Sequence, residues 1–426
     1  MTAVTAVRSG IDLSERRART RQRIIGLFYL GVAAVMLVGF ALPVAGDDAS
    51  RLVLNLPGVG ITVPDLVLPS APTAYLLAAV VAAAGGIQLT RGFGARTALV
   101  LGGVVALFVF TFLVWVAAGQ SMSLTGVLQS SVSRSVPIVF GALSGVLCER
   151  SGVVNIAIEG MLLGGAFTSA VVTSVTDNVW IGLAAAILTG AVLALVLAVL
   201  AIRYRVDQII AGFFINIFVT GLTAFLAIRW LQENRAELNT PEKFLPWNVP
   251  LLSDIPVLGP ILFRHNLFVY LLYILIAAVY FGLFYTRWGL RVRAVGEHPR
   301  AADTVGISVE WTRYTNVLLG GIVAGIGGAY LTIGSTGGFE DGMSAGKGFI
   351  GLAAMIFGGW NPIGGAMAGL VFGFADAIQG RLSILSIAIP SEFLLMLPYI
   401  VTIVVVAGVV GRARAPAADG KPYVKE

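Results

Sequence analysis

The stretch ERSGVVNIAIEG, residues 149–160, places four charged or amide side chains between long apolar segments: Glu149, Arg150, Asn155 and Glu159. Inside a bilayer such groups are costly to bury, and they commonly contact a polar solute or hold two helices together. At the edge of a bilayer the same groups cost little. The stretch therefore predicts hydrogen-bonding chemistry, and the surrounding elements decide which of its side chains lie within the membrane.

Residue types for catalysis or metal binding are sparse in this sequence. Cys148 is the single cysteine, which excludes an internal disulfide and a cysteine-based metal cluster. The two histidines, His265 and His298, are far apart, and neither has a neighbour typical of a metal ligand set. The best match to a phosphate-binding loop, GMSAGKG at 342–348, lacks its first glycine at the correct spacing and has Gly348 in place of Ser or Thr. We expect no catalytic residue, no metal site and no cofactor in this chain.

The composition is that of an integral membrane protein. Charged residues make up 12% of the 426, and the mean hydropathy is +0.90, whereas soluble domains carry about 25% charged residues. The net charge of +6 does not indicate a nucleic-acid partner, because the basic residues lie at the ends of apolar runs. The apolar run 24–43 is longer than the apolar part of a signal peptide, so we expect an uncleaved first transmembrane helix. We predict a multi-pass protein of the bacterial plasma (inner) membrane that contacts lipid and no nucleic acid.

About twelve apolar runs are long enough to cross a bilayer, which predicts an all-α, polytopic transmembrane helical bundle. The expected spans are 24–43, 73–90, 97–117, 134–149, 153–175, 179–202, 207–227, 267–286, 315–334, 346–360, 363–380 and 393–411. With the N-terminus in the cytoplasm, about 20 of the 28 lysines and arginines fall on the cytoplasmic side, which predicts an N-in/C-in orientation. Two longer segments, 44–72 and 228–265, then lie outside.

Glycines recur at four-residue spacing in several of these spans. Gly160 and Gly164 form one such pair, and Gly321 and Gly325 form another. Small residues at this spacing let helix backbones approach closely, which is ordinary packing for a helical bundle in a membrane. They predict a compact bundle and do not identify a substrate.

The longest cytoplasmic segment, residues 287–314, contains the signal of a short helix. Pro299 suits the first turn of a helix, and Gly306 suits the residue just past its end. The helix is amphipathic, with Ala302 and Val305 among the apolar residues expected to face a partner surface. Two interpretations follow: a solvated connecting loop, or a docking helix for a cytoplasmic protein.

At this segment the sequence resembles a known family. GLRVRAVGEHPRAADTVGIS, residues 289–308, is similar to the coupling-helix region of ABC importer permeases of the branched-chain amino acid, ribose and nucleoside permease family. The similarity continues through NVLLGGIVAGIGGAYL and GFIGLAAMIFGGWNPIGGAMAGLVFG, and in all it covers roughly residues 130–411. ERSGVVNIAIEGMLLGGAF at 149–167 and DQIIAGFFINIFVTGLT at 207–223 resemble the nucleoside, or simple-sugar, branch.

The resemblance implies a domain organisation and a set of partners. It places the permease core, of about ten spans, at 126–411, extra helices after a basic N-terminal segment at 1–125, and a cytoplasmic tail at 412–426. In the family a short helix seats in a groove of a separate ATP-hydrolysing subunit. The residues matching that pattern are Gly296, Glu297, Arg300, Ala301, Ala302 and Gly306. The implied partners are a cytoplasmic ABC ATPase that binds ATP and Mg, a second permease chain in a heterodimer, and an extracytoplasmic substrate-binding lipoprotein.

The implied function is to form the translocation path for nucleosides or related simple sugars. The candidate path residues are Asn155, Glu159, Phe213, Phe214, Asn216 and Asp376. Asn155 and Glu159 are four residues apart and are expected to share a helix face, as are Phe213 and Asn216. Each has an ordinary alternative: a cap or interhelical bond for Asn155, a fixed helix pair for Glu159, and packing or lipid contact for the phenylalanines. Glu149 and Arg150 are expected at a cytoplasmic turn, where charge costs little.

Other functions are compatible with parts of the sequence. One alternative keeps the class and changes the substrate to a branched-chain amino acid, although no clear pair of groups for a zwitterion is evident. Another is a secondary transporter driven by an ion gradient, which the 287–314 segment disfavours. A membrane-embedded enzyme would need a catalytic constellation that the sequence does not show. The resemblance further implies that spans 4–7 and 9–12 run in opposite senses, as in inverted-repeat transporters.

Overall fold

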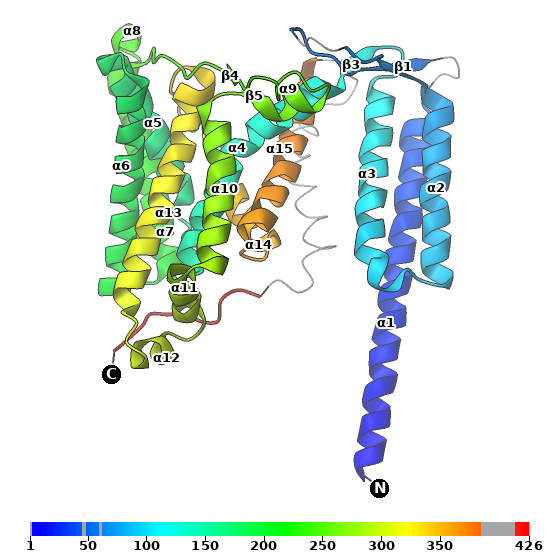
Figure 1. Cartoon of the computed structure of the whole chain (residues 1–426), viewed down its shortest axis with the longest axis horizontal. Coiled ribbons are helices and arrows are strands. Elements are labelled where there is room, and N and C mark those ends of the chain that lie inside the picture. Colours follow the sequence, from blue (N-terminus) through cyan, green and yellow to red (C-terminus); the bar gives the residue numbers. More distant parts are fainter. Residues whose placement is uncertain (1, 45–47, 59–61, 385–413, 426) are drawn as a thin grey trace. The chain divides into compact units, whose positions relative to one another are not determined.

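The computed structural model describes residues 2–44, 48–58, 62–384 and 414–425 of the chain, which divides into two compact units, 1–125 and 126–426. The chain is predominantly helical, so the all-α prediction is confirmed (Figure 1). Within the described residues, ten helices are long and apolar enough to cross a membrane. The expected last span, 393–411, lies outside these residues.

Unit 1 contains three long helices and a small sheet. Its elements are α1 (Thr2–Val35), β1 (Ala49–Val53), β2 (Leu66–Pro69), α2 (Ser70–Thr90), α3 (Thr97–Val116) and β3 (Ser121–Ser123). A π-helical turn, Met36–Ala41, extends α1. The helices pack around buried apolar side chains that include Tyr29, Met36 and Val81. β1 pairs antiparallel with β2 and parallel with β3, so the expected outer loop 44–72 is partly a sheet.

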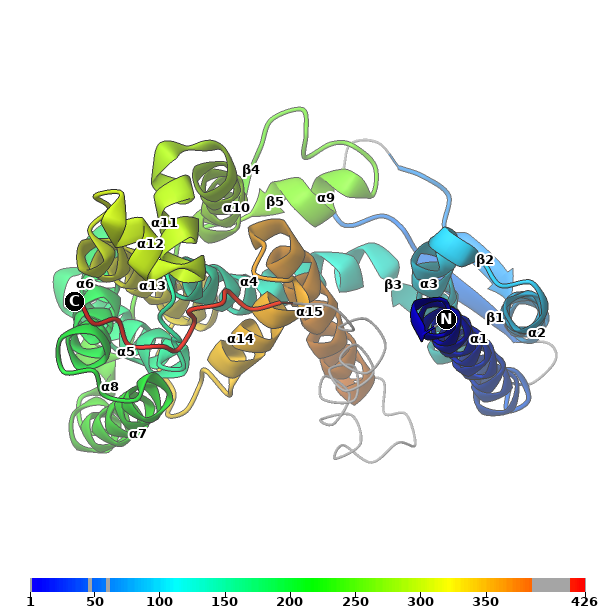
Figure 2. The ribbon, with the colours of Figure 1, turned by 90° about the horizontal axis from the view of Figure 1, so that it is seen from below.

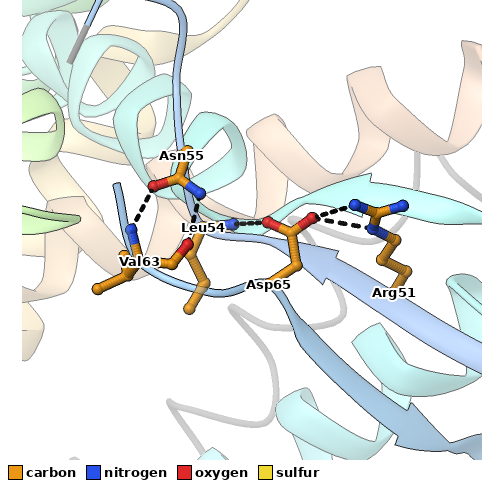
Figure 3. Close-up of polar contacts among 5 residues, drawn as sticks. All are labelled: Arg51, Leu54, Asn55, Val63 and Asp65. Carbon is orange, nitrogen blue, oxygen red and sulfur yellow. Dashed lines mark hydrogen bonds and ion pairs between the residues drawn. The ribbon is translucent and has the colours of Figure 1, made fainter. Parts of the chain in front are cut away.

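Polar contacts close the loop between β1 and β2 (Figure 3). The Asp65 carboxylate accepts hydrogen bonds from Arg51 Nε at 2.8 Å and from the backbone N–H of Leu54 at 3.4 Å. The Asn55 side chain bonds both the N–H and the carbonyl of Val63. These bonds fix the base of the loop.

Unit 2 begins within α4 and contains the remaining helices. Its elements are α4 (Leu124–Glu149), α5 (Ile158–Thr176), α6 (Val179–Ala198), α7 (Gln208–Leu226), α8 (Arg235–Leu238), β4 (Trp247–Asn248), α9 (Leu258–Phe263), β5 (Arg264–His265), α10 (Leu267–Tyr285), α11 (Arg287–Glu297), α12 (Pro299–Thr304), α13 (Val309–Leu331), α14 (Lys347–Phe357) and α15 (Pro362–Ile384). Short π-helical segments extend α6, α7 and α13 to Arg203, Leu231 and Thr336.

Glycines let α5, α6 and α13 pack backbone to backbone, as the four-residue spacing predicts. A Cβ added at Gly325 of α13 would collide with the Ala186 carbonyl oxygen of α6. A Cβ at Gly165 of α5 would lie 2.9 Å from the Gly325 carbonyl oxygen. Close approach of this kind stabilises helix pairs by van der Waals contact, because lipid gives no hydrophobic drive between helices.

Two helices of unit 2 are shorter than the sequence predicts. Residues 152–157 are not helical, so α5 starts at Ile158 and not at 153. Helix α14 has 11 residues and is therefore about 16 Å long, against a hydrocarbon core of about 30 Å. The expected span 346–360 is therefore not a full-length transmembrane helix. The non-helical segment 337–346 precedes α14 and joins it to the end of α13.

The two ends of unit 2 carry different elements. Helices α11 and α12 and residues 414–425 lie at one end, which we call the arginine-rich end (Figures 1 and 2). The short elements α8, α9, β4 and β5 lie at the opposite end. They lie within the expected outer segment 228–265, whose first residues continue α7.

Candidate functional site

The Glu159 carboxylate joins the start of α5 to the start of α14. Its Oε1 accepts hydrogen bonds from Ser344 Oγ at 2.6 Å and from the Gly346 N–H at 2.8 Å, and its Oε2 accepts one from the Gly348 N–H at 2.7 Å. Glu159 is only 8% exposed. A helix N-terminus has free N–H groups and a partial positive charge, so a carboxylate there is strongly stabilised. The geometry is that of a residue that fixes a helix pair, one of the two roles expected from sequence.

Gly348 is required for this approach. A Cβ at this position would lie 2.6 Å from both the Cα and the N of Glu159. The segment GMSAGKG therefore wraps a carboxylate with its backbone N–H groups, although it cannot be a phosphate-binding loop of the ATPase type. The sequence contained this signal, a small-residue segment before a short apolar helix, but the partner of that segment lies far away in the chain.

Asn216 of α7 fixes the bend before α5. Its Oδ1 accepts a hydrogen bond from the Gly160 N–H at 2.8 Å, and its Nδ2 donates to the Ile156 carbonyl at 2.8 Å. Asn216 is 5% exposed, so both bonds are shielded from solvent. Together with Glu159 it ties α5, α7 and α14 to one point inside unit 2. The arrangement stabilises the N-termini of α5 and α14 where they meet inside unit 2.

Asn155 and Glu159 do not share a helix face, and this prediction is wrong. Gly152 has a positive φ of 88°, and the residues after it are not helical, so Asn155 lies before the start of α5. The Asn155 Nδ2 lies 3.4 Å from Cys148 Sγ and 3.5 Å from Ser144 Oγ, both on α4, whereas Glu159 faces α14. Asn155 is fully buried, and its Oδ1 has no hydrogen-bond partner in the structure.

Glu149 ends α4 at the turn before α5, as expected, but the expectation that its charge costs little there is wrong, because Glu149 is 4% exposed. Its Oε2 accepts a hydrogen bond from Trp360 Nε1 at 2.6 Å. Arg150 donates from Nε to the Trp360 carbonyl at 2.8 Å and from Nη2 to the Gly359 carbonyl at 3.2 Å. The turn between α14 and α15 covers the charges, and sequence reasoning missed it because the two segments are distant in the chain.

The other candidate path residues lie elsewhere in unit 2. Phe213 and Phe214 are 54% and 64% exposed on α7, whereas Asn216 on the same helix faces inward, so Phe213 and Asn216 do not share one environment. Asp376 of α15 forms an ion pair with Arg134 of α4 at 3.0 Å. A path role for these residues stays a prediction.

The short helix predicted in the 287–314 segment is α12, preceded by α11. The matched residues divide into an exposed set, Glu297, Arg300, Ala301 and Gly306, and a buried pair, Gly296 and Ala302. Ala302 is 3% exposed and packs against Val295 and Val309, so the expectation that it faces a partner is wrong. Val305, 74% exposed, is available to a partner. A Cβ at Gly296 would collide with the Arg150 carbonyl oxygen, which brings the end of α11 against the α4–α5 turn.

Sequence reasoning missed a cavity of about 410 Å³ at the opposite end of unit 2. Helix α4 starts at Leu124, ten residues before the expected span, and this places Gln129 and Ser133 on one helix face above the cavity. Burial lowers the pKa of His265, so its ring is neutral beside the cationic Arg264. The lining residues are Gln129, Ser133, Lys243, Phe244, Leu245, Pro246, Arg264, His265, Asn266, Val269, Tyr330, Gly334 and Ser335. Such a mixture of aromatic and hydrogen-bonding groups suits a polar organic solute.

Comparison with known proteins covers most of the chain. A family model described as branched-chain amino acid transport system / permease component matches residues 127–406. The guanosine ABC transporter permease protein NupQ of Bacillus subtilis is 41% identical over 308 residues, 70% of this chain and 96% of NupQ. The nucleoside ABC transporter permease protein NupC of Lactococcus lactis is 40% identical over 318 residues, 71% of this chain and 99% of NupC.

A third relative has another substrate in its name. The putative glucose ABC transporter permease protein TsgC13 of Haloferax volcanii is 36% identical over 264 residues, 62% of this chain and 80% of TsgC13. No solved structure matches the chain. Family membership and the ten membrane-length helices among the described residues agree with the predicted class. The chain belongs to the permease components of branched-chain amino acid transport systems, and it is a multi-pass transport subunit of the plasma membrane.

Proposed function

We propose that this chain is the permease subunit of an ATP-driven importer for nucleosides. The observation that carries the proposal is its similarity to NupQ and NupC over nearly their whole lengths, since their names state guanosine and nucleoside transport. The match to the family model at residues 127–406 includes the bend at 149–160 and the α11–α12 segment.

The geometry supports a transporter with a site near the middle of the bilayer. Helices α5 and α14 start inside unit 2, and their N-termini meet at Glu159. Discontinuous helices of this kind commonly border substrate sites in transporters, because non-helical backbone is tolerated only where protein or a cavity surrounds it. The cavity lined by Gln129 and Asn266 lies at the opposite end of unit 2 from α12. A solute would enter at the end that carries the cavity.

The partners proposed for the chain follow from the same assignment. A cytoplasmic ABC ATPase, which binds ATP and Mg, docks on the exposed face of α12 at the arginine-rich end. A second permease chain completes the membrane part as a heterodimer, and an extracytoplasmic lipoprotein delivers the substrate. The arginine-rich end is then cytoplasmic, in agreement with the distribution of basic residues.

A simple sugar is the second candidate substrate. TsgC13, named as a putative glucose permease, supports it, although with lower identity and coverage than NupQ and NupC. A nucleoside contains a ribose and a flat base, so competition between the two classes separates them. The aromatic groups Phe244 and Tyr330 at the cavity favour a ligand with a flat face.

The test is uptake of radiolabelled guanosine by cells that lack this gene and carry it on a plasmid. Unlabelled uridine, ribose, glucose and leucine are added separately as competitors. We expect competition by uridine and little by glucose or leucine, and we expect ATP-depleted cells to lose uptake while a protonophore with ATP held constant has little effect. Competition by leucine alone would contradict the nucleoside assignment, and loss of uptake with the protonophore alone would indicate an ion-coupled transporter.

The partners are tested by purification of the tagged chain from its native membrane. We expect an ATPase with nucleotide-binding motifs, a second permease and a lipoprotein to co-purify. Recovery of the tagged chain in one species with no ATPase, under conditions that preserve uptake activity, would contradict the proposal.

A further inference from the structure

Residues 414–425, here called the C-terminal strap, are docked against the arginine-rich end of unit 2 (Figure 2). The Ala418 N–H donates to the Gly296 carbonyl at 2.8 Å, and the Ala417 N–H donates to Glu297 Oε2 at 3.2 Å. Ala418 is only 5% exposed. The strap is therefore bonded to the end of α11, although its sequence, rich in small and charged residues, resembles a free tail.

The strap also holds α12. Tyr423 packs against Val295, Ala302 and Val309, which form a small apolar cluster at the arginine-rich end. Lys425 Nζ lies 3.5 Å from Asp303 Oδ1. Helix α12 has only six residues, and such a short helix depends on tertiary contacts for its position. Part of that support comes from the strap.

On its other side the strap contacts the bend between α4 and α5. A Cβ at Gly152 would lie 3.2 Å from the Ala418 carbonyl oxygen, and a Cβ at Gly420 would lie 3.5 Å from Val154. Arg313, 1% exposed, donates from Nη1 to the Lys421 carbonyl at 3.0 Å. The strap thus fills the space in front of the bend and is fixed there by a buried charge.

The bend leads directly to the Glu159 junction. From Gly152 five non-helical residues reach Ile158, and Glu159 then bonds the start of α14. A displacement of α12 at its exposed face can therefore reach the Glu159 junction through packed contacts. Tyr423 contacts α12, and the strap joins it to Ala418. Ala418 in turn contacts Gly152, from which the bend leads to Glu159. The close approach of Gly296 to the Arg150 carbonyl is a second connection between α11 and the bend.

We propose that the C-terminal strap is a positioning element that transmits the movement of α12 to the bend carrying Glu159. This inference rests on the proposed function, because it gives the strap a part in coupling ATP hydrolysis to transport. Coupling between distant sites requires a contiguous packed connection or an element with two arrangements. The strap supplies the connection between α12 and the non-helical segment 153–157, whose backbone is not held by the hydrogen bonds of a helix.

The first experiment compares two altered chains with a matched control in the complete transporter. One chain lacks residues 414–426, the second carries Tyr423→Ala, and the control carries Val424→Ala, since Val424 is 47% exposed. Guanosine uptake and ATP hydrolysis are measured on the same proteoliposomes. We expect the uptake-to-hydrolysis ratio to fall by about fivefold or more in the first two chains, with ATPase co-purification retained and the control unchanged.

An unchanged ratio in both altered chains would overturn the proposal. A parallel loss of uptake, hydrolysis and co-purification in Tyr423→Ala would also overturn it, because the strap would then serve only assembly. If the shortened chain does not reach the membrane, Tyr423→Ala decides. A wild-type complex that hydrolyses ATP without guanosine uptake would refute the proposed substrate and leave the strap to the second experiment.

The second experiment does not depend on substrate. Hydrogen–deuterium exchange of the purified chain reports the backbone at 153–160, which includes Val154, the neighbour of Gly420 in the strap. We expect faster exchange there in Tyr423→Ala and in the shortened chain than in Val424→Ala. Equal exchange in all three would mean that the strap does not position the bend, and the inference would be wrong.

Discussion

We expect Glu159→Ala to destabilise unit 2 and to lower uptake, while the chain still reaches the membrane. The change removes the acceptor of three hydrogen bonds, from Ser344 Oγ and from the N–H groups of Gly346 and Gly348. It also removes the negative charge at the start of α14, where the helix dipole is favourable to an anion. The site is buried, so water cannot replace the lost acceptor without a cavity to enter.

The magnitude follows from the donors left without a partner. An unsatisfied buried donor costs about 1–3 kcal/mol, and hydrogen bonds to charged groups are at the strong end of their range. A value of about 1–1.5 kcal/mol for each of the three donors gives a loss of about 3–4.5 kcal/mol in the free energy of unfolding. Glu159→Gln keeps one acceptor oxygen but turns an NH₂ group toward a backbone N–H, so we expect about half of that loss.

The assay is thermal unfolding of the purified chain in detergent, followed by size-exclusion chromatography of the soluble fraction. For a unit of this size about 1 kcal/mol corresponds to about 2 °C in Tm, so Glu159→Ala should lower Tm by about 6–9 °C. The matched control is Asp376→Asn, whose ion pair with Arg134 is partly exposed and should contribute less than about 1 kcal/mol. If Asp376→Asn lowers Tm as much as Glu159→Ala does, the carboxylate is not an anchor and the reasoning is refuted.

Three further predictions test other parts of the structure. Gly325→Val should prevent close packing of α13 on α6, because even a Cβ collides with the Ala186 carbonyl oxygen; the check is loss of the monodisperse peak in detergent, and a normal peak would contradict the packing. Val305→Asp should lower ATPase co-purification about tenfold while Tm stays unchanged, because this side chain is 74% exposed next to α12. Ala302→Trp should lower both co-purification and Tm, since Ala302 is buried. Equal Tm values for the two variants would mean that α12 presents another face to the ATPase. Burial raises the pKa of Asp419 from 3.8 to about 6, so the neutral carboxyl stabilises the docked strap. This stabilisation is complete below pH 3.8 and is lost as the pH rises through about 6. Limited proteolysis should cleave the strap faster at about pH 8 than at about pH 5, and Asp419→Asn should make this difference smaller, because Asp419 shares a hydrogen bond with Glu149. Equal cleavage of the wild-type strap at both pH values would contradict the role given to Asp419.

The sequence was sufficient for the features that depend on local composition. Long apolar runs predicted the helices of both units, because a bilayer requires about 20 apolar residues per crossing. Pro299 and Gly306 predicted α12, because both residues act on their own backbone. Glu159 could be singled out as a buried carboxylate because no charged residue follows it in the apolar run of α5.

The features that the sequence did not predict depend on partners distant in the chain. Ser344 lies 185 residues from Glu159, and Trp360 lies 211 residues from Glu149. No local pattern reports these pairs, so α14 was predicted as a full span and Glu149 as solvated. The C-terminal strap was predicted only as a cytoplasmic tail, because its docking depends on backbone groups at Gly296 and on the space in front of Gly152.

The two helix pairs at the Glu159 junction have the same order of elements in opposite directions. Helix α4 runs toward the arginine-rich end, a non-helical segment turns back, and α5 starts beside Gly141 and Gly145 of α4 and runs away from that end. Helix α13 runs away from the arginine-rich end, residues 337–346 turn back, and α14 starts at Glu159 and runs toward it.

This arrangement explains why one carboxylate can serve both helices. An inverted pair brings two helix N-termini, each with a partial positive charge, to the same depth from opposite sides, and an anion between them reduces their repulsion. α5 supplies that anion from its own first turn, and α14 supplies the N–H groups and Gly348. A movement that separates α5 from α14 must break three charge-assisted hydrogen bonds together, so the junction favours two discrete arrangements over gradual sliding. Under the proposed transport function, a change of state that separated α5 from α14 would have to break the bonds of Glu159, as in transporters with a two-state element.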